Sequence, residues 1–287
     1  MSANNHRRPS TSSISLILLA AGIGSRLTPY SRWLPKCLMP IHNNCLMDYW
    51  FDLVSKSSIS EIRLNCHAHK KLVQSYLSGI ESRFKKSVVI FHEPTLLGPT
   101  LGVAGMLETV KQDIVVIAHA DNFTDLNFDD LIYFFEDSIS SCGENAIGVV
   151  SFEVNQTAEV GVFALSPDGK CIDYFEKIDR APSTIANGAI YILKAAHAKR
   201  IFAGEINNVE LAPFLFFRLL EAVRLYMHDG YLIDIGTEER LLQANRKAEV
   251  CSRVVSRFGN KEFYRSEGFM KVSRKLKNRG ELISHGR

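Results

Sequence analysis

In the first half of the chain, short apolar segments alternate with segments whose apolar residues recur at helical spacing. Apolar runs that end at Gly, Asn or Asp predict strands, and the segments between them predict helices. This rhythm predicts an α/β fold, in which helices cover both faces of a mostly parallel sheet. The predicted strands span residues 13–20, 61–66, 87–91 and 113–120, and the predicted helices span residues 45–57, 70–80, 100–110 and 127–139.

After about residue 145 the pattern changes to longer strands, which makes the predicted sheet a mixed one. Ser166-Pro167-Asp168-Gly169 has the composition of a turn and predicts a hairpin within residues 160–177. Thr237 suits the N-cap of a long helix over residues 237–258. The remaining predictions are strands at 145–154 and 187–194, a helix at 209–223, and two short strands around Asp229-Gly230.

Length and hydropathy predict one main domain. With 287 residues, 46% of them apolar, the chain can bury a large core. We expect a disordered tail over residues 1–13, the main domain over 14–250, and a basic helical extension over 251–287. No apolar run reaches 18 residues, so no membrane insertion is expected. The start of the chain also resembles a signal peptide, but cleavage near Ala21 would destroy the loop described below.

The distribution of charge and the cysteine content indicate possible partners and the cellular compartment. The extension 251–287 carries ten Lys or Arg and three Glu, a charge of +7, whereas the whole chain carries +3. Such a segment could meet an anionic partner, or it could be a solvated helical face that packs on the main domain or on a second subunit of a homo-oligomer. No nucleic-acid partner is expected. Six cysteines without a Cys-x-x-Cys pair indicate a reducing, cytoplasmic compartment.

A glycine-rich loop, Ala21-Gly22-Ile23-Gly24-Ser25, follows the first predicted strand. Glycines let backbone N–H groups approach an anion, and ligands of open α/β sheets bind at the carboxyl ends of the strands. Arg26 and Lys36 add positive charge that suits a nucleotide polyphosphate. The dinucleotide-binding fingerprint fails, because Leu27 stands in the place of its third glycine, and the P-loop pattern is absent. On the glycines alone, a plain turn remains possible.

The segment that surrounds the glycine-rich loop carries a more specific pattern than the two glycines alone. Residues 19–29, Leu-Ala-Ala-Gly-Ile-Gly-Ser-Arg-Leu-Thr-Pro, and residues 35–40, Pro-Lys-Cys-Leu-Met-Pro, resemble the opening of the sugar-1-phosphate nucleotidyltransferases. The resemblance continues to about Asn245 through residues 164–177, 187–193 and 228–245. It is nearest to the mannose-1-phosphate guanylyltransferase and heptose-1-phosphate nucleotidyltransferase branch. It implies a Rossmann-like nucleotide-diphospho-sugar transferase fold and makes residues 14–250 the catalytic domain.

The resemblance also implies the site. Asp121 and Asp234 each follow or end an apolar strand, and the family uses these two positions to hold Mg²⁺, a hard ion that prefers carboxylates and phosphate oxygens. The expected catalytic residues are Arg26, Lys36, Asp121 and Asp234. The expected nucleotide-binding residues are Leu19, Ala20, Ala21, Gly22, Gly24, Ser25, Arg26, Lys36, Glu93 and Gly98. The expected sugar-phosphate residues are Gly161, Glu176, Lys177, Asn187 and Gly188.

The expected reaction transfers a nucleotidyl group from a nucleoside triphosphate to a sugar 1-phosphate, for the synthesis of a surface polysaccharide. Guanylyl transfer to a mannose- or heptose-type phosphate is the first expectation, followed by thymidylyl, uridylyl and cytidylyl transfer. Pro99 and Leu101 depart from the family pattern after Gly98, which puts base selection in doubt. The alternatives are a non-catalytic, regulatory paralogue that binds nucleotide sugar, and a cytidylyltransferase that acts on a non-sugar phosphate.

Overall fold

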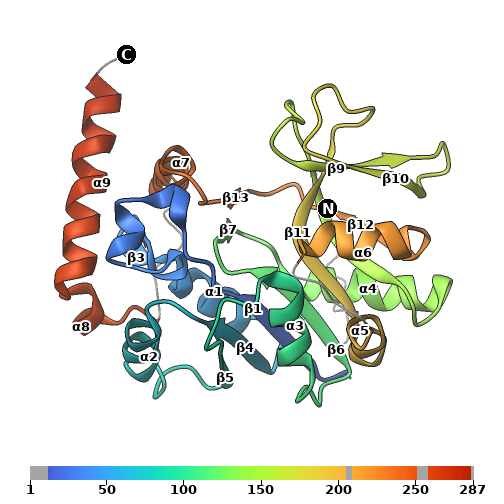
Figure 1. Cartoon of the computed structure of the whole chain (residues 1–287), viewed down its shortest axis with the longest axis horizontal. Coiled ribbons are helices and arrows are strands. Elements are labelled where there is room, and N and C mark those ends of the chain that lie inside the picture. The colour runs from blue at the N-terminus through green and yellow to red at the C-terminus, as the bar shows by residue number, and fades with distance from the viewer. Residues whose placement is uncertain (1–11, 205–208, 251–257, 286–287) are drawn as a thin grey trace, which may run out of the picture.

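A computed structural model describes residues 12–204, 209–250 and 258–285 of the chain. Its centre is a nine-stranded mixed sheet (Figure 1). The parallel part holds β5 (Ser87–His92), β4 (Glu61–Cys66), β1 (Ile14–Leu19) and β6 (Ile114–His119), side by side in that order. Every residue of β1 is buried, as expected for a strand with neighbours on both edges and helices on both faces.

The second half of the chain adds the antiparallel part. The ten-residue strand β11 (Ile185–Lys194) pairs with β6 along Ile190–Lys194 and with β8 (Ile147–Glu153) on its other edge. The first part of β11 also meets the hairpin of β9 (Gly161–Leu165) and β10 (Cys171–Glu176) at Ala186. The strand β12 (Val223–Met227) closes this edge by pairing parallel to β8. In Figure 1 the hairpin stands above the parallel strands.

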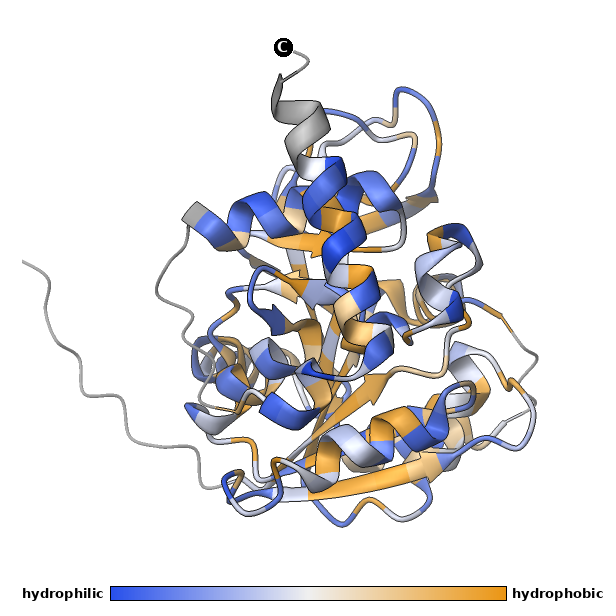
Figure 2. Cartoon of the chain, turned by 90° about the vertical axis from the view of Figure 1, so that its left-hand side faces the viewer, coloured by the Kyte–Doolittle hydropathy of each residue, from blue (hydrophilic) through white to orange (hydrophobic). Residues whose placement is uncertain are grey.

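Helices cover both faces of the sheet. On one face lie α1 (Leu46–Ser55), α2 (Lys70–Ser78) and α4 (Phe128–Cys142), linked by ring contacts such as Trp50 with Phe128 and Phe51 with Tyr76. On the other face α3 (Pro99–Leu107) contacts α5 (Ala195–Phe202) and α6 (Leu211–Leu219). Apolar residues gather along the central strands, and hydrophilic residues cover the outer helices (Figure 2). No helix in the described part of the chain is long and apolar enough to span a bilayer.

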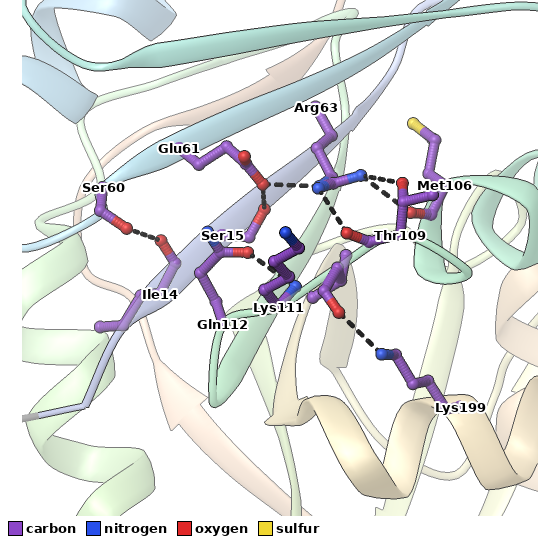
Figure 3. Close-up of polar contacts among 11 residues, drawn as sticks. Ile14, Ser15, Ser60, Glu61, Arg63, Met106, Thr109, Lys111, Gln112 and Lys199 are labelled. Atoms are coloured by element: carbon purple, nitrogen blue, oxygen red, sulfur yellow. Dashed lines mark hydrogen bonds and ion pairs between the residues drawn. The ribbon is translucent and has the colours of Figure 1, made fainter.

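A buried arginine anchors α3 at the amino ends of the strands (Figure 3). The Nε atom of Arg63 donates to Oε1 of Glu61 at 2.6 Å, and its Nη atoms donate to the carbonyl oxygens of Met106 and Thr109 at 3.2 and 2.9 Å. These carbonyls belong to the last turn of α3 and the residues after it, where backbone oxygens lack partners within the helix. Arg63 therefore fixes one end of α3, and the other end begins at Gly98 and Pro99.

Two small two-stranded sheets lie outside the main one. One pairs β7 (Asn122–Thr124) with β13 (Leu232–Asp234), and the other pairs β2 (Pro40–Ile41) with β3 (Asn44–Cys45). The two strands predicted around Asp229-Gly230 are therefore present, but they pair with different partners and not with each other. The predicted turn at 166–169 is confirmed by the bond from the Gly169 N–H to the Ser166 carbonyl, 2.9 Å long. The helix α5 was not predicted.

The end of the chain is helical. Thr237 caps α7 (Glu238–Val250), because its Oγ1 accepts the Arg240 N–H at 3.3 Å. Beyond residues 251–257, which lie outside the described part, α8 (Lys261–Tyr264) and α9 (Glu267–His285) run along the main domain. The Tyr264 hydroxyl donates to the buried carboxylate of Asp48 in α1. In Figure 1 α9 forms the left side of the molecule and extends beyond it. The extension predicted over 251–287 is thus helical where it is described.

The predicted tail over residues 1–13 lies outside the described residues up to residue 11. The described end of it is held in place. The backbone N–H and the hydroxyl of Ser13 both donate to Oδ2 of Asp113 at 2.9 Å. Ser13 is therefore bonded to the residue that precedes β6, and the tail over residues 1–13 stays a prediction.

Candidate functional site

The glycine-rich loop is positioned by a buried asparagine. Asn65 lies in β4, opposite Leu19 at the end of β1. Its Oδ1 atom accepts the backbone N–H of Ala20 at 2.6 Å and that of Ala21 at 3.3 Å. These are the first amides after the strand, so the side chain of Asn65 sets the direction in which the loop leaves the sheet. Sequence reasoning missed Asn65, because one polar residue in a strand carries no pattern of its own.

Asn65 is itself held by Glu93, which is fully buried. The Nδ2 atom of Asn65 donates to Oε1 of Glu93 at 2.7 Å, and Oε2 of Glu93 accepts the Leu97 N–H at 3.0 Å. A Cβ atom at Gly102 would lie 2.8 Å from Oε1 of Glu93 and 2.9 Å from Nδ2 of Asn65. The helix α3 can therefore approach these two side chains only because residue 102 is glycine.

The two glycines of the loop have different surroundings. Gly24 has a φ of +71° and caps the short 3-10 helix Ser25–Leu27, and a Cβ atom there would lie 3.1 Å from Cγ of Lys36. A Cβ atom at Gly22 would meet nothing within 4 Å. Gly22 borders the cavity described below, whereas Gly24 and Ser25 are not among the residues that line it. Gly24 thus packs against Lys36, and Gly22 leaves the backbone open to a ligand.

The pairing of β13 with β7 brings the two aspartates close together. Asp121 lies between β6 and β7, and Asp234 ends β13 opposite Asn122 of β7. The N–H of Ile235 donates to the carbonyl oxygen of Asp121 at 3.0 Å, which ties the two segments together. Oδ2 of Asp121 accepts from Nζ of Lys36 at 2.6 Å, and Oδ1 of Asp234 accepts the Gly236 N–H at 2.7 Å.

These carboxylates influence each other. Burial raises the pKa of Asp121, but the positive charges of Lys36 and His119 and the hydrogen bond from Lys36 outweigh burial, so the pKa lies below its ordinary value. Burial also raises the pKa of Asp234, and the negative charge of Asp121 adds to that rise. Two carboxylates that repel each other in a partly dry site suit a bound cation.

The donor set fits magnesium better than a transition metal. In the described residues no group of three or more His, Cys, Asp or Glu side chains could hold a metal ion. Mg²⁺ is commonly held by one or two carboxylates, with phosphate oxygens and waters completing its shell. Asp121 and Asp234 supply two such carboxylates at one wall of the cavity. His119 also lines the cavity.

On the opposite side, the β9–β10 hairpin supplies a second polar group. Oε2 of Glu176 accepts the Tyr174 hydroxyl at 2.5 Å, and Oε1 of Glu176 lies 3.4 Å from Nζ of Lys177. A Cβ atom at Gly161 would lie 1.8 Å from the Tyr174 hydroxyl and 2.9 Å from Oε2 of Glu176. Only glycine therefore fits at residue 161 while these side chains keep their places.

The strand β11 contributes Asn187 and Gly188. The Nδ2 atom of Asn187 donates to the Tyr191 hydroxyl at 3.1 Å, and its Oδ1 accepts the Ala189 N–H at 2.9 Å. A Cβ atom at Gly188 would lie 2.7 Å from the carbonyl oxygen of Val150 in β8. Gly188 therefore allows a close approach between β11 and β8 where the regular register between them shifts.

One cavity of about 720 Å³ lies between the glycine-rich loop, the two aspartates and the hairpin. All the residues expected at the site line it, apart from Gly24 and Ser25. The lining therefore includes Leu19, Ala20, Ala21, Gly22, Arg26, Lys36, Glu93, Gly98, Asp121, Gly161, Glu176, Lys177, Asn187, Gly188 and Asp234. It also includes residues that the sequence reasoning did not select, among them Asn65, Glu159, Tyr174, Tyr191, Glu210 and Arg240.

Comparison with known proteins shows the family of the chain. The model of the nucleotidyl transferase family matches residues 15–250. Mannose-1-phosphate guanyltransferase of Debaryomyces hansenii is 26% identical over 233 residues, which cover 79% of this chain and 62% of that protein. D-glycero-alpha-D-manno-heptose 1-phosphate guanylyltransferase of Campylobacter jejuni is 26% identical over 230 residues, which cover 78% of this chain and 95% of that protein.

Solved structures share the fold. A UDP-glucose pyrophosphorylase complexed with UDP-glucose superposes with a TM-score of 0.69 at 18% identity, over 84% of this chain and all of that chain. The chain spans between 54% and 64% of the length of four curated relatives that it matches. The family match covers the glycine-rich loop, both aspartates and the hairpin, and on this basis the chain belongs to the nucleotidyl transferase family.

Proposed function

We propose that this protein transfers a nucleotidyl group from a nucleoside triphosphate to a sugar 1-phosphate, giving a nucleotide sugar and pyrophosphate. The observation that carries the proposal is the composition of the cavity. The glycine-rich loop, Lys36 and two mutually repelling carboxylates line it together with a second polar group, made of Glu176, Lys177 and Asn187. The reaction needs two polyanions to meet, and this cavity offers a polar binding surface for each of them.

The nucleotide would bind on the side of the glycine-rich loop. Ala20 and Ala21 are held by Asn65, and Gly22 leaves the backbone accessible to a phosphate oxygen. The guanidinium of Arg26 would bind the triphosphate with charge-assisted hydrogen bonds, for which its forked geometry is suited. Lys36 would contact the α- and β-phosphates, where negative charge shifts during transfer.

Asp121 and Asp234 would hold Mg²⁺ together with oxygens of the triphosphate. When bound, the ion neutralises phosphate charge and polarises the α-phosphate. The protein's own part is to keep Asp121 ionised and to place both carboxylates beside the triphosphate. The ion pair with Lys36 lowers the pKa of Asp121 against the effect of burial, which favours the charged form.

The sugar 1-phosphate would bind on the side of the hairpin. Lys177 would hold its phosphate, and Glu176 and Asn187 would hydrogen-bond to sugar hydroxyls. The Tyr174 and Tyr191 hydroxyls orient these two side chains from behind. Gly161 and Gly188 would leave room for the sugar ring beside the backbone.

The chemistry needs no general base. The second pKa of a phosphate monoester is about 6, so a sugar 1-phosphate is largely dianionic at neutral pH. One of its oxygens attacks the α-phosphorus, a new P–O bond forms there, and the bond to the β-phosphate oxygen breaks to release pyrophosphate. Positioning and charge neutralisation by Arg26, Lys36 and Lys177 would provide the rate enhancement.

Guanylyl transfer to a mannose- or heptose-type phosphate is the specificity that we propose. Two relatives with 26% identity bear names of this activity. The base would lie near Leu96 and Pro99, which line the cavity. Glu93 has both oxygens occupied by Asn65 and by the Leu97 N–H, so it would shape this region from behind. A cytoplasmic location and a role in surface polysaccharide synthesis stay predictions.

The test is pyrophosphate release from pairs of substrates. ATP, GTP, CTP, UTP and dTTP are each combined with Mg²⁺ and with mannose 1-phosphate, glucose 1-phosphate, a heptose 1-phosphate or phosphocholine. We expect release with GTP that requires a sugar 1-phosphate. Release with phosphocholine and CTP alone would favour the non-sugar alternative. A thermal shift with a nucleotide but no release with any pair would favour the regulatory alternative, and either result would contradict the proposal.

A further inference from the structure

An ion pair spans two walls of the cavity. The Nη2 atom of Arg240 lies 2.9 Å from Oε2 of Glu159, and both residues line the cavity. They come from different parts of the fold. Glu159 precedes β9 in the segment that leads to the hairpin, and Arg240 lies in the first turn of α7. Neither residue has a part in the function proposed above.

Arg240 belongs to the wall that carries Asp234. The segment from β13 into α7 places Asp234, Gly236, Thr237 and Arg240 along the cavity within seven residues. The N-cap bond from the Arg240 N–H to Oγ1 of Thr237 fixes where the helix begins. The Arg240 side chain is 36% exposed, so its guanidinium can be reached from the cavity without any rearrangement of the backbone.

Glu159 belongs to the wall that carries Lys177. The next residue, Val160, accepts the backbone N–H of Lys177 through its carbonyl oxygen at 3.2 Å. Lys177 has a positive φ of 52°, and this bond helps to hold that backbone conformation. Arg240 is therefore joined, through Glu159, to the segment that also holds the backbone of Lys177, and both cations line the cavity.

The charges of the lining show why another cation is needed there. Six acidic and four basic side chains line the cavity. Lys36 is engaged with Asp121, and Lys177 lies 3.4 Å from Glu176. A sugar 1-phosphate carries about two negative charges at neutral pH. Lys177 alone would have to hold this dianion while a carboxylate of the same hairpin competes for its ammonium group.

From this geometry we infer that Arg240 is a second phosphate-binding residue for the sugar 1-phosphate and that Glu159 holds it in place until the substrate arrives. The inference deepens the proposed function and rests on it. On binding, the guanidinium exchanges one carboxylate for the phosphate, whose oxygens match its fork. The Glu159 side chain is 75% exposed, so water can solvate its carboxylate after release, and exposed pairs of this kind are weak.

The test compares Arg240→Gln with Arg246→Gln. Both arginines lie in α7, but Arg246 is exposed and does not line the cavity. Calorimetric titration measures the Kd of mannose 1-phosphate, glucose 1-phosphate and a heptose 1-phosphate, and separately the Kd of GTP with Mg²⁺. For the sugar phosphate that the unchanged protein binds most tightly, we expect Arg240→Gln to raise Kd about 10- to 100-fold, the value of one hydrogen bond to a charged group. We expect the Kd of GTP to change less than threefold.

Two further variants make the inference sharper. Glu159→Gln removes the competing carboxylate and should leave the Kd of the sugar phosphate unchanged or lower. Arg240→Lys keeps the charge but loses the fork, and should recover part of the affinity that Arg240→Gln loses. In turnover assays the Arg240→Gln effect should fall on KM for the sugar phosphate more than on KM for the nucleotide.

Three results would overturn the inference. Equal sugar-phosphate affinity in Arg240→Gln and Arg246→Gln would do so while the proposed function stood. A loss of GTP affinity in Arg240→Gln that exceeds the loss of sugar-phosphate affinity would assign the arginine to the nucleotide instead. Absence of binding to every sugar phosphate by the unchanged protein would overturn the inference together with the proposed function.

Discussion

The ammonium group of Lys36 lies 2.6 Å from Oδ2 of Asp121, and this contact joins the glycine-rich segment to the carboxyl end of β6. Both side chains are 17% exposed, so the pair is largely shielded from water. The backbone of Asp121 is bonded in turn to Ile235, next to Asp234. Lys36 thus bonds to one of the two carboxylates that we propose for the metal, and the backbone of the same aspartate is tied to the segment of the other.

Lys36→Gln tests this relationship. Glutamine keeps a hydrogen-bond donor but removes the charge, so we expect kcat to fall about 100- to 1,000-fold, as for the loss of one group that stabilises transition-state charge. The measurement is the rate of pyrophosphate release at saturating substrates. Lys199→Gln is the control, since Nζ of Lys199 bonds to the Val110 carbonyl, which precedes β6, and Lys199 does not line the cavity. Equal rates in the two variants would contradict the role of Lys36.

Gly102→Ala should weaken nucleotide binding, although residue 102 does not line the cavity. The new Cβ atom would lie within 3 Å of both Glu93 and Asn65, and Asn65 holds the amides of the glycine-rich loop. We expect the Kd for GTP with Mg²⁺ to rise about tenfold, together with a loss of stability of about 1–3 kcal/mol from overpacking.

Gly105→Ala is the matched control in the same helix. Its Cβ atom would lie 2.6 Å from Cζ of Phe91, the far end of a side chain in the edge strand β5. This contact does not involve the bonds to the loop. We expect a change in melting temperature but no change in the Kd for GTP. Equal nucleotide affinity in Gly102→Ala and Gly105→Ala would show that the Asn65–Glu93 pair does not set the loop.

Gly161→Ala should weaken the binding of the sugar phosphate by displacing side chains that line its proposed site. The added methyl group would displace the Tyr174 hydroxyl and, with it, Glu176. We expect KM for the sugar phosphate to rise at least about tenfold, the cost of one charged hydrogen bond, while KM for the nucleotide stays the same. Gly204→Ala is the control, because its Cβ atom would meet nothing within 4 Å. An unchanged KM in Gly161→Ala would remove Glu176 from the sugar side.

Tyr264→Phe should destabilise the fold in a pH-dependent way. Burial raises the pKa of Asp48 above its ordinary value, although hydrogen bonds from Tyr264 and Tyr76 lower it in part. Since the folded pKa is the higher one, the stabilising contribution of Asp48 is complete below the unfolded pKa of about 3.9 and is lost as pH rises through the folded value. When the buried carboxylate is charged, the Tyr264 hydroxyl offsets part of the cost of its burial.

Loss of the Tyr264 hydroxyl should therefore lower the free energy of unfolding by about 1.5–3 kcal/mol at pH 7.5. The loss should become smaller as the pH falls and Asp48 becomes protonated. Urea unfolding at pH 7.5, 6.0 and 5.0 measures the difference from the unchanged protein. Tyr49→Phe is the control, because its hydroxyl donates to the Ile41 carbonyl at 3.0 Å, an acceptor that does not titrate in this range. A cost of Tyr264→Phe that is constant or grows toward pH 5.0 would contradict the assignment.

Local pattern was enough to predict the parallel half of the fold. The strands β1, β4, β5 and β6 and the helices between them were predicted because the apolar run or the helical spacing is visible within each segment alone. The pairing of β13 with β7, and of β12 with β8, could not be predicted in that way. It depends on contacts between segments about 75 to 110 residues apart, which leave no periodic signal in either strand.

The same distinction applies to the site. Arg26, Lys36 and the aspartates stand in motifs that the sequence displays, and they line one cavity. Asn65 acts on the glycine-rich loop from β4, and one polar residue in a strand carries no pattern of its own. The bonds of Tyr174 to Glu176 and of Asn187 to Tyr191 lie within β10 and β11, and their geometry is seen only in the folded strands. Gly24 looks equivalent to Gly22 in the sequence. The structure shows that they differ. Gly24 has a positive φ and packs against the side chain of Lys36, whereas Gly22 borders the cavity.

The central claim is that this cavity joins a nucleotidyl group to a sugar 1-phosphate. Mass spectrometry of the product formed from GTP, Mg²⁺ and mannose 1-phosphate or a heptose 1-phosphate in ¹⁸O-enriched water tests it directly. The account predicts that the unchanged protein forms a nucleotide sugar without ¹⁸O. Asp137→Asn, at an exposed aspartate of α4, should form the same product at the same rate. Asp121→Asn should form it at least about 100-fold more slowly. Only ¹⁸O-labelled nucleoside monophosphate, or equal rates in Asp121→Asn and Asp137→Asn, would contradict it.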